Sequence, residues 1–216
     1  GEASGLVPGP EWKKRRFDTA WDKKQRNDEW YLGDTYHMAI GQGYLLATPL
    51  QVNAWTNVIA NDGNLCRPTI RNIDGNMHAS ECSRLHISGE TIRTITQGMV
   101  GACSPGGTSW HFFDFRVDQE DGQPQEASPS AGTKTRMFVA CKTGTAEISE
   151  NTTKTHAWFT AFAPVAGEYI GSADTHAITG NPEISVTVVV EEGGEGSEVA
   201  APIAKEILEG YFRKRL

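Results

Sequence analysis

The segment that most constrains how this chain can fold is Cys141–Glu147, with the sequence Cys-Lys-Thr-Gly-Thr-Ala-Glu. It directly follows an apolar run at 137–140. Such a run predicts a β-strand, in which neighbouring side chains point to opposite faces. Lys142 and Thr143 therefore cannot both be core residues. A strand at the edge of a sheet removes this conflict, because both of its faces and its open backbone can border one cleft.

The same segment carries groups that suit a peptide with a terminal carboxylate. Gly144 leaves the backbone rim bare, so that an extended ligand can pair with it as an added strand. Lys142 offers a fixed positive charge, and the hydroxyls of Thr143 and Thr145 can hold a carboxylate. A backbone N–H at Thr145 can stabilise an oxyanion. A Lys-Thr-Gly triplet also occurs by chance in many proteins, so its interpretation depends on the rest of the chain.

Length and composition narrow the possible functions. A chain of 216 residues with 38% hydrophobic content suits one or two domains with a sizeable core. The net charge of −7 argues against nucleic-acid binding, because no broad basic field is available to neutralise phosphates. No stretch approaches 18 consecutive apolar residues, so we expect no membrane contact by this chain itself. The four cysteines allow two disulfides in three connectivities, or none.

Two helices have clear start signals. Thr48 is placed to cap a helix at about 49–61, and Ser88 is placed to cap a second at about 89–103. The apolar positions expected to face the core are Val52, Trp55 and Ile59 in the first helix and Ile92, Ile95, Met99 and Val100 in the second.

The last third of the chain predicts strands followed by a helix. After the Lys142 strand, the side chains of residues 156–164 alternate between two faces, as in a strand. The segment Ile184–Val190 is rich in β-branched residues, which predicts a central strand buried on both faces. Residues 197–216 form an amphipathic pattern in which Pro202 predicts a kink or a true start near Ala201. We therefore predict an α+β fold, an antiparallel sheet flanked by helices.

The remaining segments show weaker patterns. We expect 11–31 to be an irregular surface segment held by aromatic residues, 64–87 to contain short strands and turns, and 104–134 to be a mobile loop. His78, Cys82 and His86 recur every fourth residue, as zinc ligands on a helix can. The surrounding glycine and asparagine disfavour a helix there, so we expect no metal site and no cofactor.

Taken together, these segments resemble the transpeptidase domain of the class B penicillin-binding proteins, in particular its elongation-type members. The resemblance covers nearly the whole chain in the family's order and rests on several short motifs: Pro10-Glu11-Trp12-Lys13, Gly33-Asp34-Thr35, Ile40-Gly41-Gln42-Gly43-Tyr44, Thr48-Pro49-Leu50-Gln51, Ala60-Asn61-Asp62-Gly63 and Lys142-Thr143-Gly144-Thr145-Ala146-Glu147.

The resemblance implies serine acyl transfer that cross-links peptidoglycan stem peptides ending in D-Ala–D-Ala, and covalent binding of β-lactam antibiotics. It implies Lys142 and Thr145 as catalytic residues, and Thr143, Gly144 and Thr145 as substrate-binding residues. It also implies an extracytoplasmic protein with an N-terminal transmembrane anchor and a cell-wall glycosyltransferase as partner.

The sequence departs from the family in three places. No serine of the chain has a lysine three positions later, so the family's Ser-x-x-Lys motif is absent, and the single Ser-x-Asn, Ser149–Asn151, follows the Lys142 motif instead of preceding it. We therefore expect residues 1–216 to be the C-terminal portion of a single transpeptidase domain that lacks the nucleophile. Cys141 stands where the family usually has glycine, as either a thiol beside the cleft or a small buried residue.

Two other functions remain open from the sequence. One is a non-catalytic scaffold module that lost its nucleophile. The other is a relative of the serine β-lactamases or carboxypeptidases, which share Lys-Thr-Gly but are expected to lack the block Ile40–Gln51.

Overall fold

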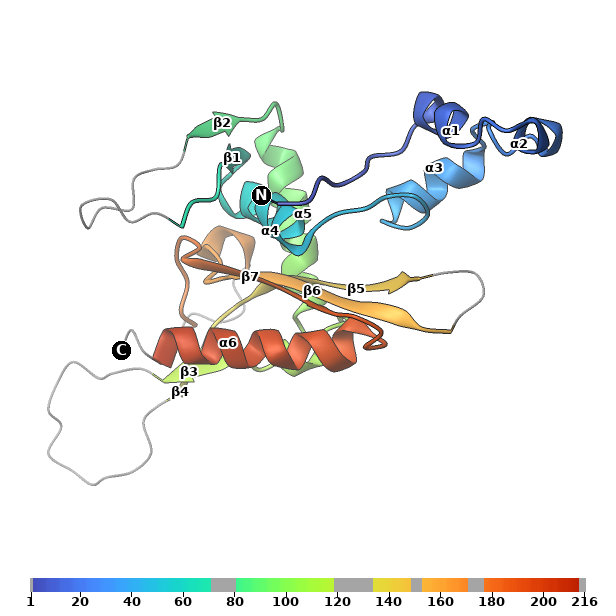
Figure 1. Cartoon of the computed structure of the whole chain (residues 1–216). Helices are drawn as coiled ribbons and strands as arrows, with labels where there is room; N and C mark the ends of the chain where they lie inside the picture. Colours follow the sequence, from blue (N-terminus) through green and yellow to red (C-terminus); the bar gives the residue numbers. More distant parts are fainter. Residues whose placement is uncertain (1, 71–80, 119–133, 149–152, 171–176, 214–216) are drawn as a thin grey trace, which may run out of the picture. The chain divides into compact units, whose positions relative to one another are not determined.

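The computed structural model of the chain describes residues 2–70, 81–118, 134–148, 153–170 and 177–213 (Figure 1). It contains two compact units, Gly1–Gln51 and Val52–Leu216. Each unit is described by itself.

The first unit contains three short helices, α1 (Pro10–Arg16), α2 (Ala20–Gln25) and α3 (Leu32–Ala39). The expectation of an irregular segment at 11–31 was therefore wrong. These helices are too short to show a repeating apolar stripe, and none of them is stable alone at such lengths. Caps and side-chain contacts hold them instead; in α2, the hydroxyl of Thr19 accepts a hydrogen bond from the amide of Asp22.

An ion pair links α1 to α3. Lys13 Nζ lies 2.6 Å from Asp34 Oδ2, and the two side chains are 7% and 14% exposed. Lys13 Nζ also lies 5.2 Å from the ring centre of Tyr31 and 5.8 Å from that of Tyr44. Burial raises the pKa of Asp34, but the hydrogen bonds from Lys13 and the Tyr31 amide, with the lysine charge, outweigh it and leave this pKa below its ordinary value. This ion pair joins two of the motifs on which the family resemblance rests, Pro-Glu-Trp-Lys and Gly-Asp-Thr.

Helix α4 (Pro49–Ala60) begins as predicted. Thr48 Oγ1 accepts from the Gln51 amide at 3.1 Å, and Gln51 Oε1 accepts from the Thr48 amide at 2.9 Å, which completes a capping box. Its predicted stripe was partly wrong, because Thr56 and Val58 are the buried positions whereas Trp55 is 49% exposed.

The second unit is built on a three-stranded antiparallel sheet in the order β5 (Ala140–Glu147), β6 (Thr155–Ala163) and β7 (Ile184–Val190). This confirms the predicted antiparallel meander. The prediction that β7 is central and buried on both faces is not met among the described residues: β6 is central, and in β7 Val186 is buried while its neighbours are half-buried. A central position for β7 would require a further strand on its other side, and such a strand stays a prediction.

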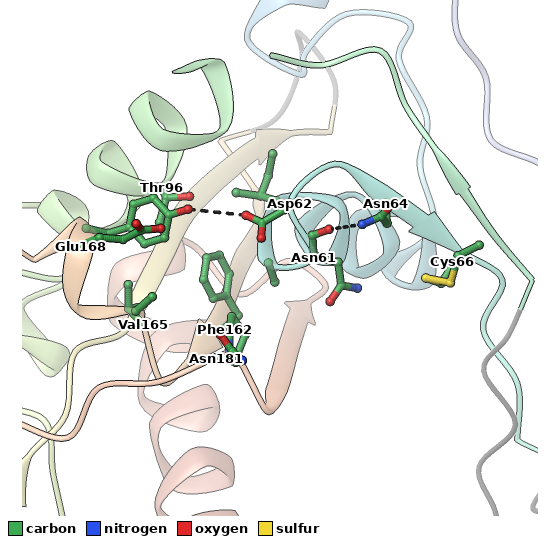
Figure 2. Close-up of a pocket in the computed structure, with 15 residues that line it drawn as sticks. Asn61, Asp62, Asn64, Cys66, Thr96, Phe162, Val165, Glu168 and Asn181 are labelled. Carbon is green, nitrogen blue, oxygen red and sulfur yellow. Dashed lines mark hydrogen bonds between the residues drawn. A yellow bond between two sulfur atoms is a disulfide. The ribbon is translucent and has the colours of Figure 1, made fainter. Parts of the chain in front are cut away.

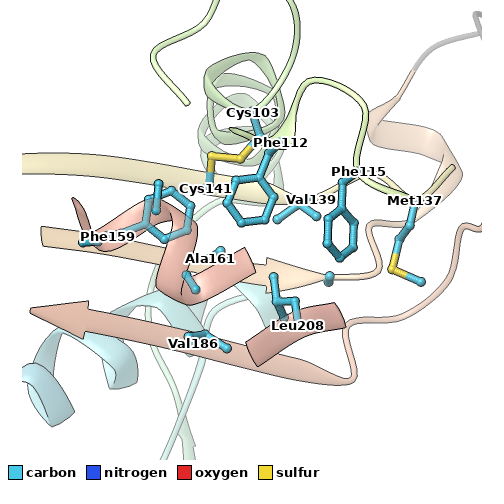
Figure 3. Close-up of a cluster of buried hydrophobic side chains, with 14 of the residues drawn as sticks. Cys103, Phe112, Phe115, Met137, Val139, Cys141, Phe159, Ala161, Val186 and Leu208 are labelled. Atoms are coloured by element: carbon cyan, nitrogen blue, oxygen red, sulfur yellow. A yellow bond between two sulfur atoms is a disulfide. The ribbon is translucent and has the colours of Figure 1, made fainter. Parts of the chain in front are cut away.

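One face of this sheet is covered by α6 (Ala201–Arg213) and is called the α6 face (Figures 1 and 3). The small and aromatic side chains that β6 directs to it are Ala157, Phe159, Ala161 and Ala163, as predicted. Leu208 of α6 is fully buried against this face, and Phe112 stacks on Phe159 with ring centres 5.2 Å apart. The main core of the unit lies here.

The opposite face is covered by α5 (Gly89–Ala102) and the end of α4, and is called the α5 face (Figure 1). Ser88 caps α5 as predicted, since its hydroxyl accepts from the Thr91 amide at 3.1 Å. The buried positions of α5 are Ile92, Thr96 and Val100, whereas the predicted core residue Ile95 is 40% exposed.

Shorter elements complete the unit. The short strands expected in 64–87 include β1 (Asn64–Cys66) and β2 (Cys82–Arg84), which the structure pairs antiparallel. The predicted loop at 104–134 was partly wrong, because it contains η1 (Trp110–Phe112) and strand β3 (Arg116–Asp118), which pairs with β4 (Lys134–Arg136). The described part of the unit also contains two short helical segments, η2 (Gly167–Tyr169) and η3 (Gly196–Ala200). The second leads into α6, which begins at Ala201, one of the two alternatives expected from Pro202.

Within the described residues, none of the helices combines the length and the apolar character that crossing a membrane requires.

Candidate functional site

The Lys-Thr-Gly segment lies on β5, which is at the end of the described sheet. Its residues pair directly with β6: Lys142 opposite Thr160, Thr143 opposite Phe159, and Gly144 opposite Trp158. In the sheet that the structure describes, this confirms the predicted edge position. Because directly paired residues share a face, Lys142 and Gly144 lie on the α5 face, whereas Thr143 and Thr145 lie on the α6 face.

Lys142 is exposed, and its ammonium donates to the backbone carbonyl of Thr143 at 2.6 Å. The side chain therefore lies along the strand that carries it. Its charge remains accessible to an anionic ligand or to the oxygen of a neighbouring hydroxyl, because an ammonium group can only donate. The sequence argument expects such an exposed cation beside the open edge of the strand.

A chain of hydroxyl groups lies beside Lys142 on the same face. Thr160 Oγ1 is 2.7 Å from Thr56 Oγ1 and 2.7 Å from Thr187 Oγ1. Asn53 donates to Thr187 Oγ1 at 3.2 Å and accepts from the hydroxyl of Ser185 at 3.2 Å. These bonds fix α4 to β6 and β7 and give the sheet next to Lys142 a defined position.

Gly144 is confined on both faces. A Cβ built on Gly144 would lie 3.1 Å from the Cβ of Trp158, and a Cβ built on Gly196 would lie 2.4 Å from the carbonyl oxygen of Gly144. The sequence argument gave Gly144 one purpose, a bare backbone rim. Packing against Trp158 and Gly196 supplies a second reason for glycine in the motif.

Thr108 was missed by the sequence argument. Its Oγ1 lies 3.0 Å from Oγ1 of Thr143, although the two residues are 35 positions apart. Thr108 is exposed and Thr143 is half-buried, so both hydroxyls can reach a ligand on the α6 side of the strand edge. The one signal that could have pointed to this contact is Gly107, since a glycine often marks a close backbone approach.

Cys141 is fully buried and forms a disulfide with Cys103. A thiol beside the cleft is thereby excluded, and the alternative of a small buried residue is confirmed. The second disulfide joins Cys66 to Cys82, which selects one of the three possible connectivities and removes Cys82 as a thiolate ligand. His78 and Ser149–Asn151 lie outside the described residues, and the described part of the chain contains no group of three or more potential metal ligands.

A separate hollow of about 580 Å³ lies on the α5 side, near the end of β6 (Figure 2). Its floor includes Phe162 and Val165, and its polar rim includes Asp62, Glu168 and Tyr169. The hydroxyl of Tyr169 donates to Asp62 Oδ1 at 3.5 Å, and burial together with these two carboxylates raises the pKa of Tyr169. None of the four residues predicted for the Lys-Thr-Gly site (Lys142, Thr143, Gly144 and Thr145) lines this hollow.

Comparison with known proteins gives a consistent set of relatives. The penicillin binding protein transpeptidase domain family matches residues 17–209. Peptidoglycan D,D-transpeptidase MrdA of Haemophilus influenzae is 30% identical over all of this chain and over 30% of its own length.

Two solved structures also resemble this chain. One is the complex between penicillin-binding protein 2 (PBP2) and MreC from Helicobacter pylori, with a TM-score of 0.65, 30% identity, and coverage of 98% of this chain and 31% of the other. The other is Pseudomonas aeruginosa PBP2 in complex with WCK 5153, with a TM-score of 0.63, 30% identity, and coverage of 98% and 39%.

The chain thus spans about a third of the length of these relatives. The family match covers most of the chain and includes β5 with its Lys-Thr-Gly segment. This chain belongs to the penicillin-binding protein transpeptidase domain family.

Proposed function

We propose that the protein carrying this chain is a peptidoglycan D,D-transpeptidase of the elongation type, and that residues 1–216 are the C-terminal portion of its transpeptidase domain. The observation that carries the proposal is the exposed Lys142 on the edge strand β5, with hydroxyl groups on the other face of the same edge. The name of the H. influenzae relative supports the reaction class.

The proposed reaction is acyl transfer in two steps. A serine hydroxyl attacks the carbonyl carbon between the two D-alanines, the C–N bond breaks, and D-alanine leaves with the proton that the serine gave up. An amine of a second stem peptide then attacks the acyl-serine ester and releases the serine. A β-lactam acylates the same serine when its ring amide bond opens.

The residues of β5 would serve the first step. Lys142 would lie beside the serine of the Ser-x-Asn motif and assist proton movement. Thr143 and Thr145 would hold the carboxylate of the peptide or antibiotic, Gly144 would let the peptide pair with the strand edge, and the Thr145 amide would form half of an oxyanion hole. Support comes from the exposure of Lys142 and Thr145 and the half-burial of Thr143.

The nucleophile would come from outside this chain. Acylation needs a serine activated by an adjacent base, and none of the serines here has a lysine one helical turn away. We propose that residues 1–216 alone have no acyl-transfer activity.

The proposed partners are stem peptides ending in D-Ala–D-Ala, β-lactams and a cell-wall glycosyltransferase. The H. pylori relative was solved in complex with MreC. The MreC protein of the organism from which this chain comes is therefore a further candidate partner. We place the protein outside the cytoplasm, anchored by an N-terminal transmembrane helix. The two disulfides support this compartment, because such bonds persist in oxidising environments.

The test is the acylation rate of the full-length gene product with a fluorescent penicillin. Lys142→Ala should lower this rate by about 10²–10³, the usual cost of losing one such group, with an unchanged melting temperature. Lys24→Ala, which removes an exposed lysine of α2, is the matched control. Equal acylation rates in the two variants would contradict the role of Lys142.

A non-catalytic scaffold is the second candidate, favoured by the absence of Ser-x-x-Lys from residues 1–216. It predicts no acylation of the wild-type full-length gene product at any penicillin concentration.

A further inference from the structure

The contact between Thr108 and Thr143 is placed by a tightly constrained loop. At its start, Cys103 is joined by a disulfide to Cys141, which lies two residues before Thr143 on the same face of β5. At its end, the Ser109 amide donates to the Ala102 carbonyl at 2.9 Å. The loop that carries Thr108 is thus attached to the strand that carries Thr143.

Gly107 shows how closely this loop approaches α5. A Cβ at this position would lie 2.2 Å from the carbonyl oxygen of Gly101 and 2.4 Å from that of Ala102. The Gly107 amide also donates to the Ser104 carbonyl at 2.8 Å. These contacts hold Thr108 in one place even though its own side chain is exposed.

Hydroxyl chemistry gives this placement a consequence. A threonine hydroxyl has one proton to donate and can also accept. Between Thr108 and Thr143 at 3.0 Å, either oxygen can be the donor. An ionised carboxylate, however, can accept only, so Thr143 must direct its proton to a bound carboxylate and must then accept from Thr108. A hydroxyl that accepts one bond becomes a better donor in the next.

We propose that Thr108 is a positioning residue for carboxylate recognition. Its hydroxyl donates to Thr143 Oγ1 and so directs the Thr143 proton to the carboxylate of the stem peptide or the β-lactam. This role rests on the proposed acyl-transfer function and adds to the site a residue outside the Lys-Thr-Gly segment.

The test compares two ligands and three variants of the full-length gene product. The ligands are benzylpenicillin and its methyl ester, which lacks the carboxylate charge. The variants are Thr108→Val, Thr108→Ser, and Thr94→Val as an exposed threonine control on α5. Initial binding and the acylation step are separated by stopped-flow measurement, and melting temperatures are recorded.

Thr108→Val should weaken initial binding of benzylpenicillin about three- to tenfold, the effect of one lost hydrogen bond, with little change in the acylation step. It should leave binding of the methyl ester unchanged. Thr108→Ser should restore wild-type behaviour, because it keeps the hydroxyl, and Thr94→Val should show no effect.

Two results would overturn the role of Thr108 while the proposed function stands: unchanged benzylpenicillin binding in Thr108→Val, or an equal loss for benzylpenicillin and its ester. A wild-type protein that neither penicillin acylates would overturn the proposed function, and the role of Thr108 with it.

Discussion

Gly196 lies directly against Gly144 of the Lys-Thr-Gly segment. A Cβ on Gly196 would come within 2.4 Å of the Gly144 carbonyl oxygen and 2.1 Å of that of Trp158. Both oxygens belong to strand backbone, which cannot move as the end of a flexible side chain can. The turn that leads into α6 therefore sets the position of the strand that carries Lys142.

Gly196→Ala should destabilise the protein by about 1–3 kcal/mol, since an inserted methyl group must displace β5 or the turn. Thermal unfolding checks this directly. Gly210→Ala is the matched control, because Gly210 lies in α6 with open space where its Cβ would be, and alanine there should be neutral or slightly stabilising. Equal melting temperatures for the two variants would show that the segment around Gly196 accommodates a methyl group without loss of stability, which would contradict the prediction.

Asp34→Asn should destabilise the first unit by about 3 kcal/mol at pH 7, because it leaves the buried Lys13 ammonium without its anionic partner. The folded-state pKa of Asp34 lies below its ordinary value of about 3.9, so its stabilising effect is complete above that pH and disappears as the pH falls through the folded-state pKa. The difference in melting temperature between wild type and Asp34→Asn should therefore shrink between pH 7 and pH 3.

Asp18→Asn changes an exposed carboxylate of the same unit and serves as the control. A difference between wild type and Asp34→Asn that stays constant over this pH range would show that the ion pair is not its source.

The two disulfides should differ in stabilisation and in accessibility. Cys103–Cys141 spans 38 positions and Cys66–Cys82 spans 16, which corresponds to about 4 and 3 kcal/mol of lost chain entropy in the unfolded state. Replacing both cysteines of a pair by alanine should lower the free energy of unfolding, and the decrease should be larger for Cys103–Cys141 than for Cys66–Cys82. Under mild reduction of the folded protein, the exposed Cys82 should be alkylated before the buried Cys141.

Peptide mass spectrometry after alkylation measures this order. Alkylation of Cys141 before Cys82 would contradict the burial of the Cys103–Cys141 bond.

Local sequence signals predicted the parts of the fold that depend on local physics. The capping box at Thr48 located α4, and the alternation in 156–164 located β6 and its two faces. Pro202 indicated either a kink or a start near Ala201, and α6 begins at Ala201. Helices α1 to α3 were missed because their stabilisation is not local: the partner of Lys13 is Asp34, 21 positions away.

The candidate site shows the same division. The sequence motif predicted Lys142, Thr143 and Thr145 as site residues, and their roles stay a prediction. The edge position of their strand followed from their polarity and is found in the described sheet. Thr108 and Gly196 could not be found in this way, because their contacts with β5 exist only once the chain has folded. The pairing of Cys103 with Cys141 was likewise one of several possibilities until the structure brought the two residues together.

The most direct test of the account is intact-mass spectrometry after incubation with benzylpenicillin, followed by peptide mapping, on residues 1–216 and on the full-length gene product. We predict one covalent adduct on the full-length gene product, at a serine outside residues 1–216, and no adduct on the isolated chain. An adduct on any serine of residues 1–216, or none on the full-length gene product, would contradict it.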